Sequence, residues 1–550
     1  MIRLLIILQL FVLSSLSAQE PLTATQWQED LRFLQQTIHK EYAFLFVKTN
    51  KETFDAEVEA LYQDIPNLQE HEIQVGLARI VSLFEYGHTH LSFYQKAIQF
   101  SQFPFNLYQF KEDIYIQGTH KRYANAVGAK VIAVAGKPIA EVLKAIEPTV
   151  EAENSQYFKA YGINNLRYPE ILHAQSITDS LQDEIELTLE KNGKTFTQSF
   201  TVLEKGDYVP THRGFVHQDD NWVTAREQAT MPLYLQQLDK VYFATYLSKE
   251  NAMYVRHSRI KNEAEESTKE FYDRVLKEVA AKGAEKLIID LRLNGGGNNY
   301  LNKEVIKALI KADEINQTGK LFVIIGRRTF SACQNLVNEI DNYTNAIFVG
   351  EPTAENINFW GDNRPVILPN STINIAVSYL WWQDKPALEN AEWMAPSIPV
   401  EMSFEEYVTN QDPVLEAALA FNNPNFKPKP LEYIVSLYTS GQTQKLAEEL
   451  PKMIQDPQYA FFDFETGLIK LGNLLLQSRR GPQVQASIQL FSTVLAFYPQ
   501  SASAYKHLGE SYMFLGQTKK AAEALNKAIQ LDSANQVGAE AKVLLAEMGN

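Results

Sequence analysis

The feature that most constrains the fold of this chain is a strand-loop-helix pattern that occurs twice in succession. In the first copy an apolar run enters the polar, glycine-rich loop of segment 287–297, and an amphipathic segment follows at 301–309. In the second copy an apolar run at 321–325 leads through a polar loop into an amphipathic segment at 332–340. Buried strands that alternate with helices of this length predict a parallel α/β core.

Ser331 is the candidate nucleophile, because it stands at the predicted start of the second helix with the glycines 295–297 nearby. Glycines let the backbone expose its N–H groups, and a helix N-terminus presents more of them. Together these groups suit a developing oxyanion. The alternative reading of Ser331 is a helix N-cap in an ordinary α/β turn.

Five short motifs in a fixed order favour the nucleophile. They are Asp-Leu-Arg-x-Asn-x-Gly-Gly from 290, Thr-Phe-Ser-Ala from 329, Gly-Glu-Pro-Thr from 350, Leu-Pro-Asn-Ser from 368 and Asp-Pro-Val-Leu from 412. This set resembles the core signature of tail-specific, or carboxy-terminal processing, serine peptidases, a family that includes tricorn-core-like enzymes. The resemblance implies a crotonase-like or ClpP-like spiral of ββα units, a protein or peptide substrate, and chemistry that needs no cofactor.

The general base that the resemblance implies is His88. Many relatives use a lysine that follows the nucleophile helix, but segment 353–358 contains none, and no lysine occurs between Ser331 and Lys385. The tricorn-like branch takes a histidine from its N-terminal helical region instead. The sequence Tyr-Gly-His-Thr at 86–89 resembles the Asp-Gly-His-Thr of that branch, with Tyr86 in place of the usual acid.

His90 is the alternative to His88. Two histidines at i and i+2 on a strand face the same way and would also suit a metal ion. Because no Asp, Glu or Cys follows at ligand spacing, we expect a structural role for His90 and no metal.

The remaining parts of the site are an orienting carboxylate and an oxyanion hole. Relatives place an acid a few residues before a Trp-x-x-Pro pattern, which maps best onto Glu389, with Glu392 as the alternative. The competing interpretation is that both acids are solvated loop residues. The backbone N–H groups of Gly296 and Ala332 are the predicted oxyanion donors.

Composition limits the class of protein. The chain has 550 residues, enough for several domains, and its 45% hydrophobic and 21% charged content is typical of soluble globular proteins. A formal net charge of -15 argues against nucleic acid as a partner. The single cysteine, Cys333, excludes an intrachain disulfide and is expected to be a buried packing thiol.

The first residues predict export. A basic start, an apolar stretch and a small-residue end at 1–18 are typical of a signal peptide. No later apolar run approaches the ~18 residues that a spanning helix needs. We therefore expect a soluble, periplasmic or secreted mature chain without a transmembrane segment.

Periodicity and linker composition predict several domains. The expected divisions are the signal peptide (1–18), an N-terminal helical region (19–97), a PDZ-like β module (98–205), the serine peptidase core (206–421), a proline-containing linker (422–433) and tetratricopeptide-like helical repeats (434–550). A plain β insertion remains the alternative for the PDZ-like module. A helical cap that stabilises the core remains the alternative for the repeats, which otherwise suit a protein partner.

Two other classes of function compete with an exported serine endopeptidase that acts on unfolded or tail-exposed proteins. One is a catalytically inactive, peptidase-like protein that binds a hydrophobic ligand or a peptide. The other is an exported tetratricopeptide scaffold.

Overall fold

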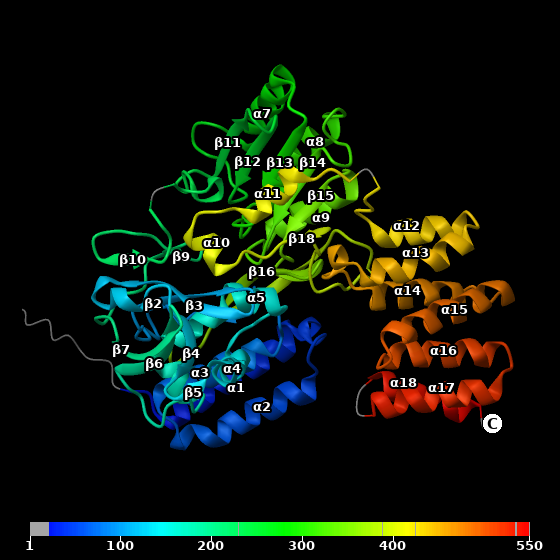
Figure 1. The fold of residues 1–550 in the computed structure, drawn as a ribbon. Helices are drawn as coiled ribbons and strands as arrows, with labels where there is room; N and C mark the ends of the chain where they lie inside the picture. Colours follow the sequence, from blue (N-terminus) through cyan, green and yellow to red (C-terminus); the bar gives the residue numbers. More distant parts are fainter. Residues whose placement is uncertain (1–20, 229, 388, 424, 534–535, 549–550) are drawn as a thin grey trace, which may run out of the picture.

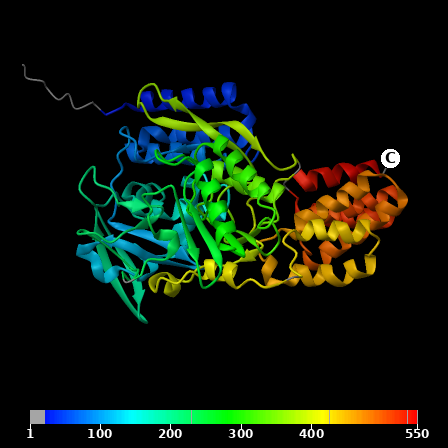
Figure 2. The same ribbon diagram turned by 90° about the horizontal axis from the view of Figure 1, so that it is seen from above.

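The computed structural model of the protein describes residues 21–548 apart from 229, 388, 424 and 534–535. The predicted signal peptide lies outside the described residues. Figure 1 shows N-terminal helices and a β-sheet at one end, an α/β core next to them, and a stack of C-terminal helices beside the core; the same order is seen from above in Figure 2. The predicted multidomain α/β class is thus confirmed, with a helical C-terminal region.

The N-terminal region consists of helices whose apolar faces are buried. The helices are α1 (Ala24–Glu41), α2 (Lys51–Asp64) and α3 (Glu70–Ser82). Thr23 and Gln26 form a capping box that satisfies the first N–H groups of α1. The apolar positions that predicted α1 are all buried: Trp27, Leu31, Leu34 and Ile38. The turn after α3 carries His88.

An antiparallel sheet follows. Its strands are β2 (Phe105–Phe110), β3 (Asp113–His120), β4 (Lys130–Val134), β5 (Lys137–Pro138), β6 (Glu184–Lys191), β7 (Lys194–Thr201) and β10 (Trp222–Thr224). Helices α4 (Ile139–Ile146), α5 (Ser155–Ala160) and α6 (Pro169–Ala174) lie between β5 and β6 in the chain. Strand β10 pairs with β3, so the chain contributes to this sheet beyond the predicted boundary at 205. Strands β8 (Thr211–His212) and β9 (Phe215–Val216) form a separate pair.

The core is a six-stranded sheet in the order β11-β12-β13-β14-β15-β18. Its strands are β11 (Tyr242–Leu247), β12 (Ala252–His257), β13 (Lys286–Asp290), β14 (Leu321–Ile325), β15 (Ile347–Gly350) and β18 (Ile398–Pro399). All pairs are parallel except β11 with β12. The helices of the core are α7 (Thr268–Lys282), α8 (Asn302–Lys311), α9 (Ala332–Tyr343), α10 (Phe404–Val408) and α11 (Pro413–Ala420).

Both faces of this sheet are covered. Along β13, Leu287 and Ile289 pack into one apolar cluster with α7, α8 and α9, whereas Ile288 packs into another with α11. Because successive strand residues point to opposite faces, a strand covered on both sides must be apolar throughout. This burial explains the unbroken apolar runs in the sequence.

A three-stranded sheet joins the N-terminal region to the core. It contains β1 (His90–Leu91), β17 (Asn374–Gln383) and β16 (Asn358–Ile367), in that order. Strand β1 pairs with β17 through His90 and Ala376, and Thr89 Oγ1 donates to Ser378 Oγ at 2.9 Å. The buried Asp30 of α1 accepts the backbone N–H groups of Asn370 and Ser371, each at 2.8 Å. These contacts fix the turn that carries His88 against the core.

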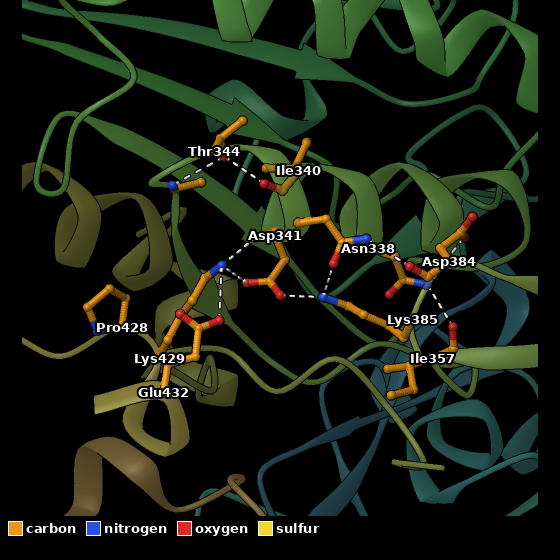
Figure 3. Close-up of polar contacts among 12 residues, drawn as sticks. Asn338, Ile340, Asp341, Thr344, Ile357, Asp384, Lys385, Pro428, Lys429 and Glu432 are labelled. Atoms are coloured by element: carbon orange, nitrogen blue, oxygen red, sulfur yellow. Dashed lines mark hydrogen bonds and ion pairs between the residues drawn. The ribbon is translucent and has the colours of Figure 1, made fainter. Parts of the chain in front are cut away.

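The C-terminal helices are attached to the core near the end of α9. They are α12 (Pro430–Thr439), α13 (Thr443–Gln455), α14 (Phe464–Gln477), α15 (Gly481–Phe497), α16 (Ala502–Phe514), α17 (Thr518–Leu531) and α18 (Gln536–Glu547). Figure 3 shows Lys429, just before α12, donating to the backbone carbonyl of Asp341 at 2.5 Å, with Glu432 beside it. Lys385 pairs with the same aspartate from the other side. Asp341 of α9 therefore links the start of the C-terminal helices to the loop after β17.

Glycines bring neighbouring C-terminal helices close together. A Cβ at Gly472 in α14 would lie 2.5 Å from the ring of Phe491 in α15, and one at Gly509 in α16 would lie 2.7 Å from Leu525 in α17. Small residues where helices cross are what the tetratricopeptide-like prediction requires, and that assignment stays a prediction.

Gly472→Ala should lower the stability of the C-terminal helices by about 1–3 kcal/mol, because the added methyl group overlaps the Phe491 ring. The matched control is Gly481→Ala at the start of α15, where a Cβ meets nothing within 4 Å. Thermal unfolding of both variants measures the difference. Equal unfolding temperatures would show that the two helices are not in close contact.

Candidate active site

Ser331 lies at the junction of its loop and α9 in an unusual backbone conformation. Its φ is 58° and its ψ is -134°, and its side chain makes no capping hydrogen bond. A positive φ at a residue other than glycine is strained, and strain of this kind gathers at functional sites. The hydroxyl is thus held on a sharp strand-to-helix turn instead of capping the helix.

His88 meets Ser331 from the N-terminal region. Its Nε2 lies 3.0 Å from Ser331 Oγ. Its ring stacks on Phe330 at a centroid distance of 4.7 Å. Burial lowers the pKa of His88, which favours the neutral imidazole that a proton acceptor needs. Only glycine fits just before His88, since a Cβ at Gly87 would lie 2.4 Å from the Tyr157 ring.

The carboxylate beside His88 belongs to Glu355, in the loop between β15 and β16. Its Oε1 lies 3.2 Å from His88 Nδ1, and the side chain is 0% exposed. Its Oε2 accepts the backbone N–H of Ser331. Burial raises the pKa of Glu355, and the hydrogen bond from Ser331 opposes this shift. A hydroxyl against an imidazole that is backed by a carboxyl group is the arrangement that turns serine into a nucleophile.

A second buried carboxyl group, Glu153, binds the chain next to both His88 and Glu355. One of its oxygens accepts the N–H of Gly87 at 3.0 Å; the other accepts the backbone and side-chain N–H groups of Asn356 at 3.2 and 2.7 Å. Gly87 precedes His88 and Asn356 follows Glu355. Burial, and then the neighbouring Glu355, raise the pKa of Glu153 to about 8. Like charges this close in a buried site favour retention of a proton.

The structure does not bring Glu389 or Glu392 to His88, contrary to the sequence prediction. The Glu389 side chain is 43% exposed and pairs with Lys470 of α14 at 3.5 Å. Glu392 is exposed, and only its backbone carbonyl is engaged, by Asn154 at 2.6 Å. The predicted loop runs alongside the segment that carries Glu355, with Ile357 N–H bonded to the carbonyl of Ala391. The predicted acids therefore lie next to the correct segment but face the solvent.

The two predicted oxyanion donors differ in their surroundings. Gly296 packs against the nucleophile, since a Cβ there would lie 2.6 Å from Ser331 Cβ, but its N–H donates to Asn294 Oδ1 at 2.9 Å. Ala332 is the first residue of α9, and within the described chain its N–H has no hydrogen-bond acceptor. The N–H of the exposed Gly295 also has none among the described residues. Ala332 and Gly295, rather than Gly296, thus leave an N–H free.

The other sequence candidates lie beside the site. His90 is the first residue of β1, whereas His88 lies in the turn before it. The two histidines therefore do not lie on one strand, contrary to the prediction. Cys333 is buried, and burial raises its pKa, which suits a packing thiol. Lys385 is bound to Asp341 and Asn342.

Among the residues that the structure describes, two groups of side chains have ligand atoms close enough together for a metal ion. One is His88, Glu153 and Glu355; the other is His71, Glu72 and His173, where His71 Nε2 lies 2.8 Å from His173 Nδ1. In the first group, both oxygens of Glu153 already accept N–H groups. The absence of a metal stays a prediction.

Glu355 and Glu153 are the site residues that the sequence interpretation missed. The stretch 353–358 drew attention only for its lack of a lysine, although Glu355 stands in it. Its position shortly after the β15 strand was the available signal.

Comparisons with known proteins identify the class. Residues 251–318 match the model of peptidase family S41. No curated protein sequence matches the chain. Among solved structures, mature CPAF complexed with lactacystin is 13% identical, with a TM-score of 0.45 over 70% of this chain and 95% of that one. The photosystem II D1 C-terminal processing protease is 12% identical, with a TM-score of 0.32 over 72% and 99%. The tricorn protease is 10% identical, with a TM-score of 0.31 over 72% and 36%.

A segment of the core, residues 251–318, is thus similar to peptidase family S41, a family of serine-type peptidases. This match agrees with the resemblance that the motifs predicted. The structural likenesses are too distant to assign roles to residues, so the roles must rest on the geometry of this site.

The raised pKa of Glu153 predicts how the stability of the folded chain depends on pH. The folded chain holds the Glu153 proton up to about pH 8, whereas the unfolded chain releases it near the ordinary value of 4.5. Folding therefore takes up a proton between these values, and the free energy of unfolding should fall as pH rises through this window. Glu153→Gln removes this contribution, so its stability relative to the unsubstituted chain should rise by on the order of 4 kcal/mol between pH 5 and 9.

Urea unfolding at several pH values measures this difference. The control is Glu204→Gln at an exposed position, which should follow the unsubstituted chain at every pH. If the free energy of unfolding varied with pH in the same way for Glu153→Gln and the unsubstituted chain, Glu153 would have an ordinary pKa in the folded chain.

Proposed function

We propose that this S41-family peptidase cleaves peptide bonds with Ser331 as nucleophile, His88 as general base and Glu355 as the orienting carboxylate. The observation that carries the proposal is the 3.0 Å contact between His88 Nε2 and Ser331 Oγ. A serine hydroxyl is hardly ionised near neutral pH, so it needs such a base. The strained backbone of Ser331 supports the same role.

In the first step Ser331 Oγ attacks the peptide carbonyl while its proton passes to His88 Nε2. The backbone N–H groups of Ala332 and Gly295 stabilise the oxyanion of the tetrahedral intermediate. His88 then gives the proton to the leaving amine, and an acyl-enzyme remains. A water molecule, deprotonated by His88, releases the acid product and restores Ser331.

Glu355 acts through His88. Its carboxylate lies 3.2 Å from Nδ1 and is the proposed acceptor of a hydrogen bond from the Nδ1–H group. It holds the imidazole with Nε2 towards Ser331 and stabilises the imidazolium that forms. Glu153 acts one step further away as a positioning residue, because it binds the chain next to both His88 and Glu355. The role first assigned to Glu389 thus passes to Glu355.

The substrate class and location follow from the same proposal. We infer an exported enzyme that acts on unfolded or tail-exposed proteins, supported by the apolar leader in the sequence. None of the helices in the described part of the chain has the length and apolar character to span a bilayer. The C-terminal helices are proposed to hold a protein partner or a large substrate, as stacked helix pairs commonly do.

Ser331→Ala should abolish hydrolysis of an unfolded protein and labelling by a fluorophosphonate probe. Its unfolding temperature should hardly change, because Ser331 makes no capping hydrogen bond. Gel fluorescence and a peptide assay measure both effects. Absence of labelling in the unsubstituted chain would favour an inactive binding protein or a scaffold.

Substitution of the acids separates the two carboxylate assignments. Glu355→Gln should lower kcat by about 10²–10⁴-fold, because a carboxamide cannot stabilise the imidazolium. Glu389→Gln should keep near-normal activity, since that side chain only pairs with Lys470. His88→Ala and His90→Ala form the parallel pair, with the loss confined to His88. If Glu389→Gln were the inactive variant, the carboxylate assignment would be wrong.

A further inference from the structure

A cavity of about 320 Å³ lies where the N-terminal region meets the antiparallel sheet and the core. Its walls include His90, Tyr157, Tyr161, Arg167 and Arg328. This volume is at the lower end of the range of ligand pockets and suits one side chain or one chain end of a peptide. None of the steps proposed above uses it.

The cavity shares a wall with the active site. The rings of Tyr157 and Tyr161 lie 5.6 and 6.3 Å from that of Phe330, which in turn stacks on His88. A Cβ at Gly295 would point towards Tyr161 Oη at 4.0 Å. A substrate that reaches Ser331 would therefore place a neighbouring group at the cavity.

Arg167 lines this cavity with an unused hydrogen-bond donor. The residue is only 6% exposed. Its Nε donates to the carbonyl of Asn164 and its Nη2 to Tyr94 Oη, each at 3.3 Å. Its Nη1 is buried without a partner in the described chain. A buried donor group of a charged side chain that lacks an acceptor is unfavourable, so an acceptor for Nη1 is expected from outside the chain.

Arg328 adds a second guanidinium. It donates to the carbonyl of Ala160 at 3.1 Å and lies over the Tyr161 ring at 4.6 Å. Within the described residues, neither arginine forms an ion pair with a carboxylate. Arg213 lies close to Arg328; burial, and then Arg259, Arg256 and Arg328, lower its pKa. In a chain with a net charge of -15, this is a local concentration of positive charge.

The acidic and titratable groups of the wall do not cancel this charge. Glu151 lines the cavity and accepts the Tyr157 hydroxyl at 2.8 Å. Burial raises the pKa of Glu151, although the nearby His90 opposes the shift. Glu151 forms no ion pair with Arg167 or Arg328 among the described residues. His90 contributes a buried Nδ1 without a partner among the described residues.

We propose that this cavity is a specificity pocket for a carboxylate of the substrate, bound by Arg167 and Arg328. The inference rests on the proposed peptidase function. The carboxylate belongs either to an acidic side chain near the cleaved bond or to a free C-terminus. Arginine suits either, because its planar donors match the two carboxylate oxygens.

The test uses binding and cleavage by the full chain. Fluorescent peptides that differ only by Glu against Gln, at each position around the cleaved bond, probe the side-chain source. The same peptides with a free or an amidated C-terminus probe the terminal source. Binding is measured with the Ser331→Ala variant, and kcat/KM with the active chain.

In at least one of these peptide pairs, the peptide with the carboxylate should bind roughly tenfold more tightly than its partner and have a roughly tenfold higher kcat/KM. Arg167→Met should bring that ratio close to one, and Arg167→Lys, which keeps the charge, should leave an intermediate ratio. Arg480→Met, at an exposed position in the C-terminal region, should not change it.

If the two peptides of every pair bound equally well and were cleaved at equal kcat/KM, the pocket assignment would be overturned and the peptidase function would stand. A carboxylate preference that survives Arg167→Met and Arg328→Met would also overturn the pocket assignment. Binding with the expected preference but no cleavage by the active chain would instead contradict the peptidase function and keep the pocket.

Discussion

The activity proposed for this protein depends on one contact between distant parts of the chain, that of His88 with Ser331. The histidine belongs to a turn of the N-terminal region and the serine to the core, so neither segment contains a site by itself. Their meeting depends on the pairing of β1 with β17 and on the hydrogen bond between Thr89 and Ser378. Docking of the N-terminal region is therefore part of the proposed catalytic machinery.

Two buried carboxyl groups hold the segments that make the contact between His88 and Ser331. Glu355 faces His88 and also accepts the Ser331 N–H, so one side chain positions both partners. Glu153 accepts N–H groups from the neighbours of His88 and Glu355. Burial opposes the ionisation of His88, Glu355 and Glu153, and a proton can be shared among these three side chains. In the proposed mechanism the ion pair between His88 and Glu355 forms from groups that already lie 3.2 Å apart.

The sequence singled out Ser331 and His88, which the structure brings together, because both stand in short motifs whose spacing follows local structure. Ser331 follows a buried strand, and His88 follows a glycine that the packing of Tyr157 requires. The α/β core was predictable for a similar reason: strands covered on both faces must be apolar throughout.

Glu355, the carboxylate that we propose to orient His88, was not predictable in this way. Its identity depends on which of two adjacent loop segments points inwards, and hydrogen bonds between distant residues decide this. Glu389 has a suitable position in the sequence, but it faces Lys470 of the C-terminal helices. The same limit applies to the oxyanion hole, where the Asn294 side chain engages the N–H of Gly296. The pairing of β10 with β3 across the expected domain boundary also has no local signal.

The most direct test of the account is a double-mutant cycle on His88 and Glu355, measured as kcat/KM on one unstructured peptide. The Glu355 variant is Glu355→Gln, whose amide oxygen can still accept the Ser331 N–H. If the charge of Glu355 acts through His88, the double variant should be no slower than His88→Ala alone, because removal of the imidazole already removes the role of that charge. Losses that multiply in the double variant would contradict the Ser331–His88–Glu355 arrangement, as would a cycle in which Glu389 rather than Glu355 is coupled to His88.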